Sequence, residues 1–178
     1  MCFAEKGYAA TTMKDIAARA SVSVETVYGQ GGKASLLLAA IDRTLVGDDA
    51  PEPVIERGPI KDVLTTPDPR EALHRFRDLV VEGLPGVLPL MYAFHVAAGA
   101  DTELGAAYRI YEERRLADMT RIAESLGPGL RVPTEEAADV IWALFNTGTI
   151  QALVVDRGWG VERWADWVTM TLERTLLP

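Results

Sequence analysis

Hydroxyl, phenol and ammonium groups are concentrated in a short segment near the amino terminus of the chain. Ser23 and Thr26 carry hydroxyls, and Tyr28 carries a phenol. Lys33 adds an ammonium group five residues further on. Side chains of these types donate hydrogen bonds to phosphate oxygens and to the edges of bases. The segment is therefore a candidate contact surface for nucleic acid, provided that the surrounding elements present these groups together.

Two short helices are expected to position this segment. The first is predicted at 13–20, after an N-cap at Thr11 or Thr12. The second is expected to begin near Val24, with Ser23 as its N-cap. Two helices joined by a turn of three or four residues form a helix-turn-helix, whose second helix enters the major groove of DNA.

Four small or apolar residues are expected to hold these two helices together. Ala17 and Ala20 are small where the second helix should cross the first. Val22 is expected to fill the angle from within the turn, and Val27 to face the core. The second helix would then present its polar side chains outwards.

Helical periodicity continues through the rest of the chain, so we predict an all-α fold. Residues 1–6 have the pattern of a helix end that Gly7 stops. Asp101 and Thr134 are expected to cap two of the later helices. These later helices are predicted at 33–46, 69–83, 86–99, 102–126, 134–156 and 160–176. The break between the second and third is assigned to the sequence Gly-Leu-Pro-Gly.

The segment GDDAPEPVIERGP, which begins at Gly47, is rich in proline, glycine and charge. Such a composition is typical of a connection between domains. We therefore predict a helix-turn-helix head at 1–47 and a larger helical body at 48–178.

The charge distribution distinguishes the two parts. The formal net charge of −8 opposes binding to DNA. Residues 1–47, however, carry five basic and four acidic side chains, whereas the remaining 131 residues carry 13 basic and 22 acidic ones. A near-neutral head on an acidic body fits a small DNA-contacting domain, and it also fits an acidic protein of another kind.

Composition excludes several classes of protein. The single cysteine, Cys2, rules out an intramolecular disulfide, and two histidines are too few for a metal site. No apolar run as long as a membrane span and no signal peptide are evident, so we expect a cytoplasmic protein. The sequence has no Ser-His-acid, His-Glu-x-x-His or phosphate-cradling glycine motif. We therefore expect no catalysis, no cofactor and no metal.

The segment FAEKGYAATTMKDIAARASVSVETVYGQGGKASLLLAAID, residues 3–42, resembles the DNA-binding domain of TetR-type transcriptional regulators. The matching residues are Phe3, Gly7, Tyr8, Thr11, Thr12, Ile16, Ala17, Ala20, Val22, Ser23, Tyr28, Lys33, Leu36 and Leu37. The resemblance implies a homodimer whose heads bind operator DNA and whose all-helical bodies bind a small effector and form the dimer interface. Effector binding would change the separation of the heads, so that they no longer match successive major grooves. Repression is the usual behaviour of the family.

The resemblance and the residue types together give three sets of candidate residues. DNA contacts are expected at Thr12, Ser23, Val24, Glu25, Thr26, Tyr28, Gly29 and Lys33. A largely apolar effector site with a few polar groups is expected at Met91, Tyr92, His95, Tyr111, Trp142 and Asn146. The dimer interface, for which small residues and tryptophans are suited, is expected at Ile141, Phe145, Gly148, Thr149, Ala152, Trp164, Trp167, Val168 and Thr171.

The head departs from the family pattern in three ways. The residues 29–32, Gly-Gln-Gly-Gly, stand where the family has aromatic and polar side chains. Ser21 replaces a turn glycine, so a residue with a Cβ is expected at positive φ. The family's first helix is expected to be truncated. These departures leave an alternative open, a dimeric helical ligand-binding or interaction protein whose impaired head no longer binds DNA.

Overall fold

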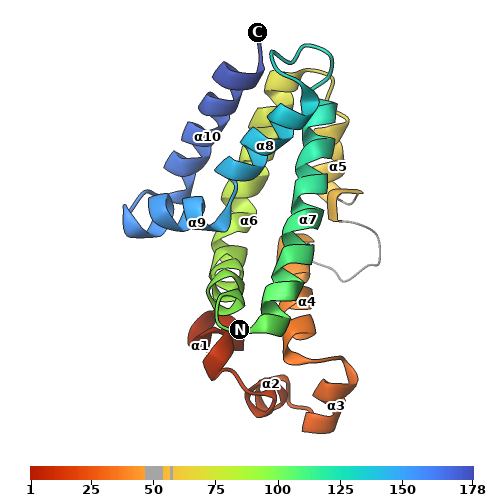
Figure 1. The fold of residues 1–178 in the computed structure, drawn as a ribbon, viewed down its shortest axis with the longest axis vertical. Helices are drawn as coiled ribbons and strands as arrows, with labels where there is room; N and C mark the ends of the chain where they lie inside the picture. The colour runs from red at the N-terminus through yellow and green to blue at the C-terminus, as the bar shows by residue number, and fades with distance from the viewer. Residues whose placement is uncertain (47–53, 57) are drawn as a thin grey trace. The chain divides into compact units, whose positions relative to one another are not determined.

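The computed structural model describes residues 1–46, 54–56 and 58–178, and all the regular structure in these ranges is helical (Figure 1). The predicted all-α fold is therefore confirmed. The helices are α1 (Cys2–Ala10), α2 (Met13–Ala20), α3 (Val24–Gly29), α4 (Lys33–Val46), α5 (Gly58–Leu64), α6 (Pro69–Ala98), α7 (Thr102–Ser125), α8 (Thr134–Leu144), α9 (Thr147–Ile150) and α10 (Val161–Leu176). A 3-10 turn, η1 (Val54–Glu56), precedes α5, and a π-helical segment, η2 (Gln151–Asp156), follows α9.

The chain forms two compact units. The first unit combines Met1–Ala50 with Gly86–Ile110, and the second combines Pro51–Pro85 with Tyr111–Pro178. The expected boundary after residue 47 lies outside the described residues and stays a prediction.

A small apolar cluster joins α2 to α3 in the first unit. Met13, Ala17 and Val27 are buried in it, and the partly buried Ile16, Val24 and Leu36 pack against them. The predicted role of Val27 is thus confirmed. The predicted roles of Val22 and Ala20 are wrong, because Val22 is 43% exposed and Ala20 is also exposed. Both residues adjoin Ser21, which has a positive φ of 57°.

The sequence Gly-Leu-Pro-Gly at 83–86 does not interrupt α6, and this corrects the prediction of two helices. Pro85 lacks the N–H that would bond the preceding turn, which disfavours a helix interior by about 3 kcal/mol relative to alanine. Leu84 and Val87 beside it are 7% and 1% exposed. Full burial of such side chains stabilises by about 1.5–3 kcal/mol each, so burial on α6 can offset the cost of the proline.

Part of α6 is more apolar than the sequence analysis allowed. An 18-residue window within it reaches a mean hydropathy of 1.5, with 33% of the window buried. By length and composition α6 could cross a membrane, as could α8 with α9 and η2, which are bent by 45° at the break between them. This corrects the statement that no apolar run has such a length. Core helices of soluble proteins meet the same criterion, so one or two such helices are weak evidence for a membrane span.

The helix predicted at 134–156 is broken into α8, α9 and η2. Phe145 ends α8, and the side chain of Asn146 caps α9 by accepting a 2.9 Å hydrogen bond from the backbone N–H of Gly148. Thr134 is not the cap of α8, because it is the first helical residue and Pro133 precedes it as an N-cap without a side-chain bond. The cap at Asp101 is confirmed, since its carboxylate accepts from the N–H of Leu104 at 2.9 Å.

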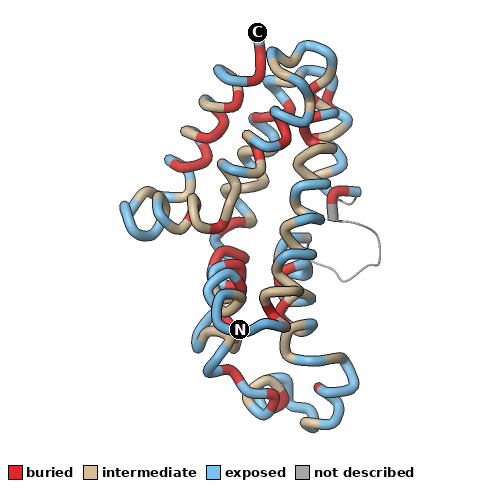
Figure 2. The backbone as a smooth tube through the Cα atoms, in the orientation of Figure 1, coloured by how far each residue is buried: buried red, intermediate tan, exposed pale blue. Residues whose placement is uncertain are grey.

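Helix α10 is amphipathic and supplies much of the core of the second unit. Buried positions recur along one side of it with exposed positions between them (Figure 2). Trp164, Val168 and Leu172 are each at most 2% exposed. The helical period therefore sets one face of α10 against the rest of the unit.

Replacing Pro85 by alanine should raise the free energy of unfolding by up to about 3 kcal/mol, because alanine restores the missing backbone hydrogen bond of α6. The measurement is urea unfolding followed by circular dichroism. Pro69→Ala is the matched control, since Pro69 occupies the first position of α6, where a backbone N–H has no helical partner. Equal effects of the two substitutions would contradict a continuous helix at Pro85.

Candidate nucleic-acid interface

The start of α2 is fixed by a reciprocal cap. The hydroxyl of Thr12 accepts a 3.1 Å hydrogen bond from the backbone N–H of Asp15, whose carboxylate accepts a 2.8 Å bond from the N–H of Thr12. Two backbone donors at the helix start are thereby satisfied. The predicted N-cap at Thr12 is confirmed, and its hydroxyl is committed to this cap.

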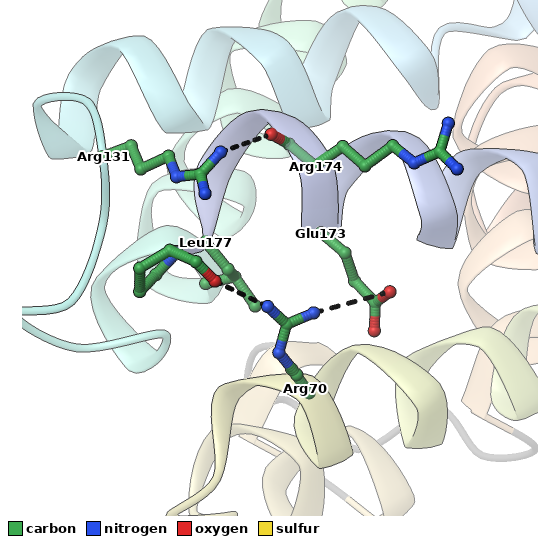
Figure 3. A pocket seen from close by; sticks show the side chains of 6 residues that line it. Arg70, Arg131, Glu173, Arg174 and Leu177 are labelled. Atoms are coloured by element: carbon green, nitrogen blue, oxygen red, sulfur yellow. Dashed lines mark hydrogen bonds and ion pairs between the residues drawn. The ribbon is translucent and has the colours of Figure 1, made fainter.

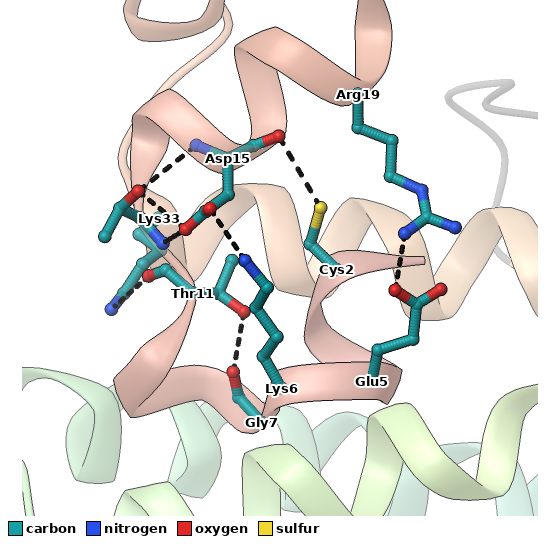
Figure 4. Close-up of polar contacts among 9 residues, drawn as sticks. Cys2, Glu5, Lys6, Gly7, Thr11, Asp15, Arg19 and Lys33 are labelled. Atoms are coloured by element: carbon teal, nitrogen blue, oxygen red, sulfur yellow. Dashed lines mark hydrogen bonds and ion pairs between the residues drawn. The ribbon is translucent and has the colours of Figure 1, made fainter.

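Two ion pairs connect α1 to α2 (Figure 4). Lys6 Nζ lies 2.7 Å from Asp15 Oδ1, and Arg19 Nη1 lies 2.6 Å from Glu5 Oε2. The hydrogen bond from Arg19 lowers the pKa of Glu5 from 4.5 to about 2. The hydrogen bond from Lys6 likewise lowers the pKa of Asp15, and the pKa of Lys6 is raised in return. The head therefore uses two of its basic side chains to hold its own helices together.

Lys33 closes the carboxyl-terminal end of α1. Its ammonium donates to the carbonyl oxygens of Tyr8 and Thr11 at 3.0 and 3.1 Å and lies 4.1 Å from the centre of the Tyr8 ring. Gly7 permits this end, since its φ of 73° is left-handed, and its carbonyl accepts from the Thr11 hydroxyl at 2.7 Å. The sequence analysis missed this structural role of Lys33, and its predicted phosphate contact stays a prediction that would use the remaining ammonium hydrogen.

Helix α3 begins at a serine cap. Ser23 Oγ accepts a 3.1 Å hydrogen bond from the backbone N–H of Thr26 and lies 3.0 Å from its hydroxyl. Ser21 before it has a φ of 57°, as the sequence predicted for a residue in place of a turn glycine. The strain of this conformation is about 1 kcal/mol for a residue with a Cβ.

Most of the candidate DNA contacts lie on the exposed surface of the head. Six of them are exposed: Thr12, Ser23, Glu25, Thr26, Tyr28 and Gly29. Tyr28 is the most prominent aromatic among them, with 62% of its surface exposed. Val24 differs, because it packs against the cluster that joins α2 to α3. Its side chain therefore serves the position of α3, and a base contact through it is disfavoured in this arrangement.

Glu25 places a negative charge at the start of α3. Its own backbone N–H and the Ser23 hydroxyl bond its carboxylate and lower its pKa. The carboxylate is therefore ionised at neutral pH and repels phosphate groups that approach this end of the helix.

Gly29 is the last residue of α3, and residues 30–32 connect α3 to α4. Gly31 has a φ of 123°, and a Cβ there would lie 3.2 Å from Ser35 Cβ, so this position favours glycine. Gly29 has no such requirement, since a Cβ there would meet open space. The departure from the family pattern thus makes a tight connection at Gly31 and leaves a smooth surface at Gly29.

Three of the effector candidates belong to one network in the second unit. Trp142 Nε1 donates to a Glu112 carboxylate oxygen at 3.1 Å, and Arg115 donates to both carboxylate oxygens at 2.8 and 3.0 Å. Arg115 also donates to the carbonyl of Phe145 at 2.7 Å and lies 5.9 Å from the ring centre of Tyr111. The third of these candidates, Asn146, follows Phe145 in the chain and caps α9.

The other three effector candidates belong to the first unit. Met91 is 7% exposed, whereas Tyr92 is 41% exposed. His95 is exposed, with its Nδ1 2.9 Å from the Tyr108 hydroxyl. All six effector assignments stay predictions.

The dimer candidates fall into two groups by burial. Ile141, Trp164 and Val168 are each at most 1% exposed within the second unit, so they are core residues and are not available to a partner in this arrangement. Their assignment to the interface is therefore corrected, because the apolar face of α10 already packs within its own chain. The exposed or half-buried members are Phe145, Gly148, Thr149, Ala152, Trp167 and Thr171, and they remain the predicted interface.

An open groove of about 510 Å³ lies at the carboxyl-terminal end of α10 (Figure 3). Arg70 donates to the Pro178 carbonyl at 2.6 Å, and Arg131 donates to the Arg174 carbonyl at 3.1 Å. Glu173 Oε2 lies 3.8 Å from Arg70 Nη1. The Arg174 side chain points away from Arg70 (Figure 3). These arginines tie the end of α10 to neighbouring segments. Among the described residues no group of histidine, cysteine or acidic side chains could hold a metal ion.

Comparison with known proteins agrees with this geometry. Residues 1–40 match the family "Bacterial regulatory proteins, tetR family". A protein from Saccharomonospora viridis, described as a transcriptional regulator and crystallised with choline, is similar in fold: the TM-score is 0.65 and the identity 19%, over 99% of this chain and 92% of that one. The TetR family transcriptional regulator PfmR from Thermus thermophilus has a TM-score of 0.56 and 20% identity, over 99% of this chain and 94% of its own. No curated protein matches the sequence.

The ion pair of Glu5 should make the stability of the head depend on pH. Because its pKa is about 2 in the folded chain and 4.5 otherwise, its stabilisation is complete above pH 4.5 and is lost as the pH falls towards 2. Glu5→Gln should therefore lower the melting temperature at pH 7 and have no effect near pH 2. Glu82→Gln, on the exposed side of α6, is the control. A difference between Glu5→Gln and wild type that does not change with pH would refute the assignment.

Substituting Lys33 by methionine should destabilise the chain by about 1–3 kcal/mol, because two carbonyl oxygens lose their donor. Lys14→Met, at an exposed lysine of α2, should leave the melting temperature unchanged. Thermal unfolding by circular dichroism measures both. An unchanged melting temperature for Lys33→Met would show that the cap at Lys33 contributes nothing to folding.

Proposed function

We propose that this chain is a TetR-family transcriptional regulator that binds operator DNA as a homodimer in the cytoplasm and is released by a small, largely apolar effector. The observation that carries the proposal is the exposed surface of α3, where Ser23, Thr26 and Tyr28 stand on a helix that is capped and packed against α2. The helix is only six residues long, so its free end can enter the major groove while α2 crosses the backbone. The regulatory role that we propose is repression, which is the usual behaviour of the family that the sequence resembles.

The geometry of DNA supports the homodimer. A six-residue recognition helix contacts few base pairs, and two such helices about 34 Å apart would contact successive major grooves on one side of a duplex. The half-buried and exposed residues at the α8–α9 break and on α10 offer the partner surface. A dimer of this kind reads a palindromic site, which sets the form of the operator.

The small-molecule effector is supported by the body of the molecule. The relative from Saccharomonospora viridis was crystallised with choline, and this chain holds the Glu112–Arg115 pair with little exposure among aromatic side chains. Isolated buried charges are costly, so a nearly buried pair among aromatic residues is typical of a binding site as well as of a structural link. Binding that moves the α8–α9 region would alter the separation of the heads.

A second candidate function is a dimeric helical ligand-binding protein that does not bind DNA. Its support is that Lys6, Arg19 and Lys33 are all engaged inside the head, and that Glu25 adds negative charge to α3. The two functions differ in one measurement, which is binding of the full chain to DNA from upstream of its own gene. A shift that salt weakens supports the regulator; its absence at low salt, with a dimer that binds small molecules, supports the second candidate.

The dependence on salt should be shallow for a DNA-binding protein. Residues 1–46 contain five basic side chains, and Lys6, Arg19 and Lys33 are bonded within the head, so at most two per head lie outside these contacts. For a dimer, the slope of log K against log salt should be no steeper than about −4. Fluorescence anisotropy with labelled operator at several salt concentrations measures it. A slope near −8 would show that the internal ion pairs open on DNA.

Tyr28→Phe should weaken operator binding by about threefold to tenfold, since the phenol donates one hydrogen bond to the backbone of DNA. The melting temperature should not change, because Tyr28 is 62% exposed. Tyr92→Phe is the matched control, at an exposed tyrosine of α6. Equal affinities of wild type and Tyr28→Phe would remove Tyr28 from the interface.

A further inference from the structure

Two buried polar atoms in the second unit have no hydrogen-bond partner among the described residues. They are Trp164 Nε1 and Thr147 Oγ1, and both residues are 0% exposed. A buried donor without a partner is destabilising, and it is rare in native proteins unless a water or a ligand completes it. The exposed polar face of α3 lies in the first unit and does not explain why these two atoms are without partners.

Both residues adjoin Phe145 at the break between α8 and α9. The Trp164 ring meets the Phe145 ring edge-on, with centroids 5.3 Å apart, and Thr147 lies two residues after Phe145 in the chain. The ring of Phe76 on α6 lies 5.2 Å from Phe145 on a tilted plane. Phe76 and Phe145 are half-buried, so this aromatic cluster of Phe76, Phe145 and Trp164 reaches the surface of the unit.

The electrostatic surroundings of the cluster favour a cation. Phe145 follows the last turn of α8, and the carbonyl end of a helix carries partial negative charge. The Arg115 guanidinium donates both to the Glu112 carboxylate and to the Phe145 carbonyl, so this ion pair adds no net charge to the break. The segments of the second unit contain 18 acidic and 12 basic side chains, which concentrates cations around it.

The chemistry of these groups specifies a ligand. An indole N–H only donates, so the ligand must offer an acceptor oxygen, while the hydroxyl of Thr147 can donate or accept. The faces of aromatic rings attract quaternary ammonium groups, and tryptophan does so most strongly. A molecule that joins a trimethylammonium group to an alcohol oxygen a few atoms away meets both requirements.

We propose that the second unit binds a small quaternary ammonium alcohol at the cluster of Phe76, Phe145 and Trp164, with the Trp164 N–H and the Thr147 hydroxyl bonding its oxygen. This inference rests on the proposed function for its regulatory meaning, because the ligand is then the effector. The ligand contacts the α8–α9 break directly, where Arg115 holds the Phe145 carbonyl. Binding therefore changes the geometry of the break and of the predicted dimer surface beside it.

The first test is calorimetry of the full chain with choline and with 3,3-dimethylbutan-1-ol, which has the same shape and oxygen but no charge. Choline should bind at least about tenfold more tightly, because only the cation is attracted by the ring faces. Equal binding of the two compounds would overturn the cationic part of the proposal. Binding of neither would overturn the proposal entirely.

The second test is Thr147→Val, which preserves the volume of the side chain and removes the orphan hydroxyl. The melting temperature should rise, because an unsatisfied buried group is gone, while choline should bind about tenfold more weakly. Thr66→Val is the control, at another buried threonine of the second unit, because the Thr66 hydroxyl already donates to the Asp62 carbonyl at 2.8 Å, and choline binding should be unchanged. A higher melting temperature of Thr147→Val with unchanged choline affinity would show a core role only and overturn the site.

The operator assay separates this inference from the proposed function. Choline binding without any DNA binding would support the site and refute the regulator. Operator binding without choline binding would refute the site and leave the regulator in place. Both activities, with choline weakening the operator complex in wild type and about tenfold less effectively in Thr147→Val, would support both.

Discussion

The presentation of α3 depends on a very small contact. A helix of six residues has no stability of its own in water, so α3 exists only because a cap and a packing surface hold it. The cap is Ser23, and the packing surface is the cluster in which Val27 meets Met13 and Ala17. The polar side chains of α3 point outwards as a consequence. The orientation of the exposed polar face of α3 therefore depends on the buried side chain of Val27 and the hydroxyl of Ser23.

Several charged residues of the head stabilise its fold. Lys6 and Arg19 bind acidic partners across the junction of α1 and α2, and Lys33 completes the end of α1. In the proposed complex with DNA, hydrogen bonds and the pairing of two heads therefore contribute more than net charge. The acidic body is compatible with this arrangement, because the negative charges of Glu25 and of the body would repel DNA of any sequence and so limit non-specific binding to it.

In the second unit, the break between α8 and α9 determines which side chains meet. One continuous helix would have placed its residues on a single stripe, whereas the break brings Phe145 against Trp164 and exposes a carbonyl to Arg115. Asn146 makes the break stable by capping the next turn. The π-helical turn that follows is a conformation frequently found at functional positions. Packing, polar links and the unpartnered donors thus meet at one place in the second unit.

Features that depend on local chemistry were predictable from the sequence: the caps at Thr12, Ser23 and Asp101, the positive φ of Ser21, and the all-helical fold. The helix-turn-helix residues were recognisable for the same reason, since short-range spacing defines them. Tertiary structure alone decided the continuity of α6 through Pro85 and the break at Phe145, because burial by distant segments offsets or exceeds local preferences. It also turned Trp164 into a core residue and Lys33 into a helix cap, because the partners of both side chains lie far away in the sequence.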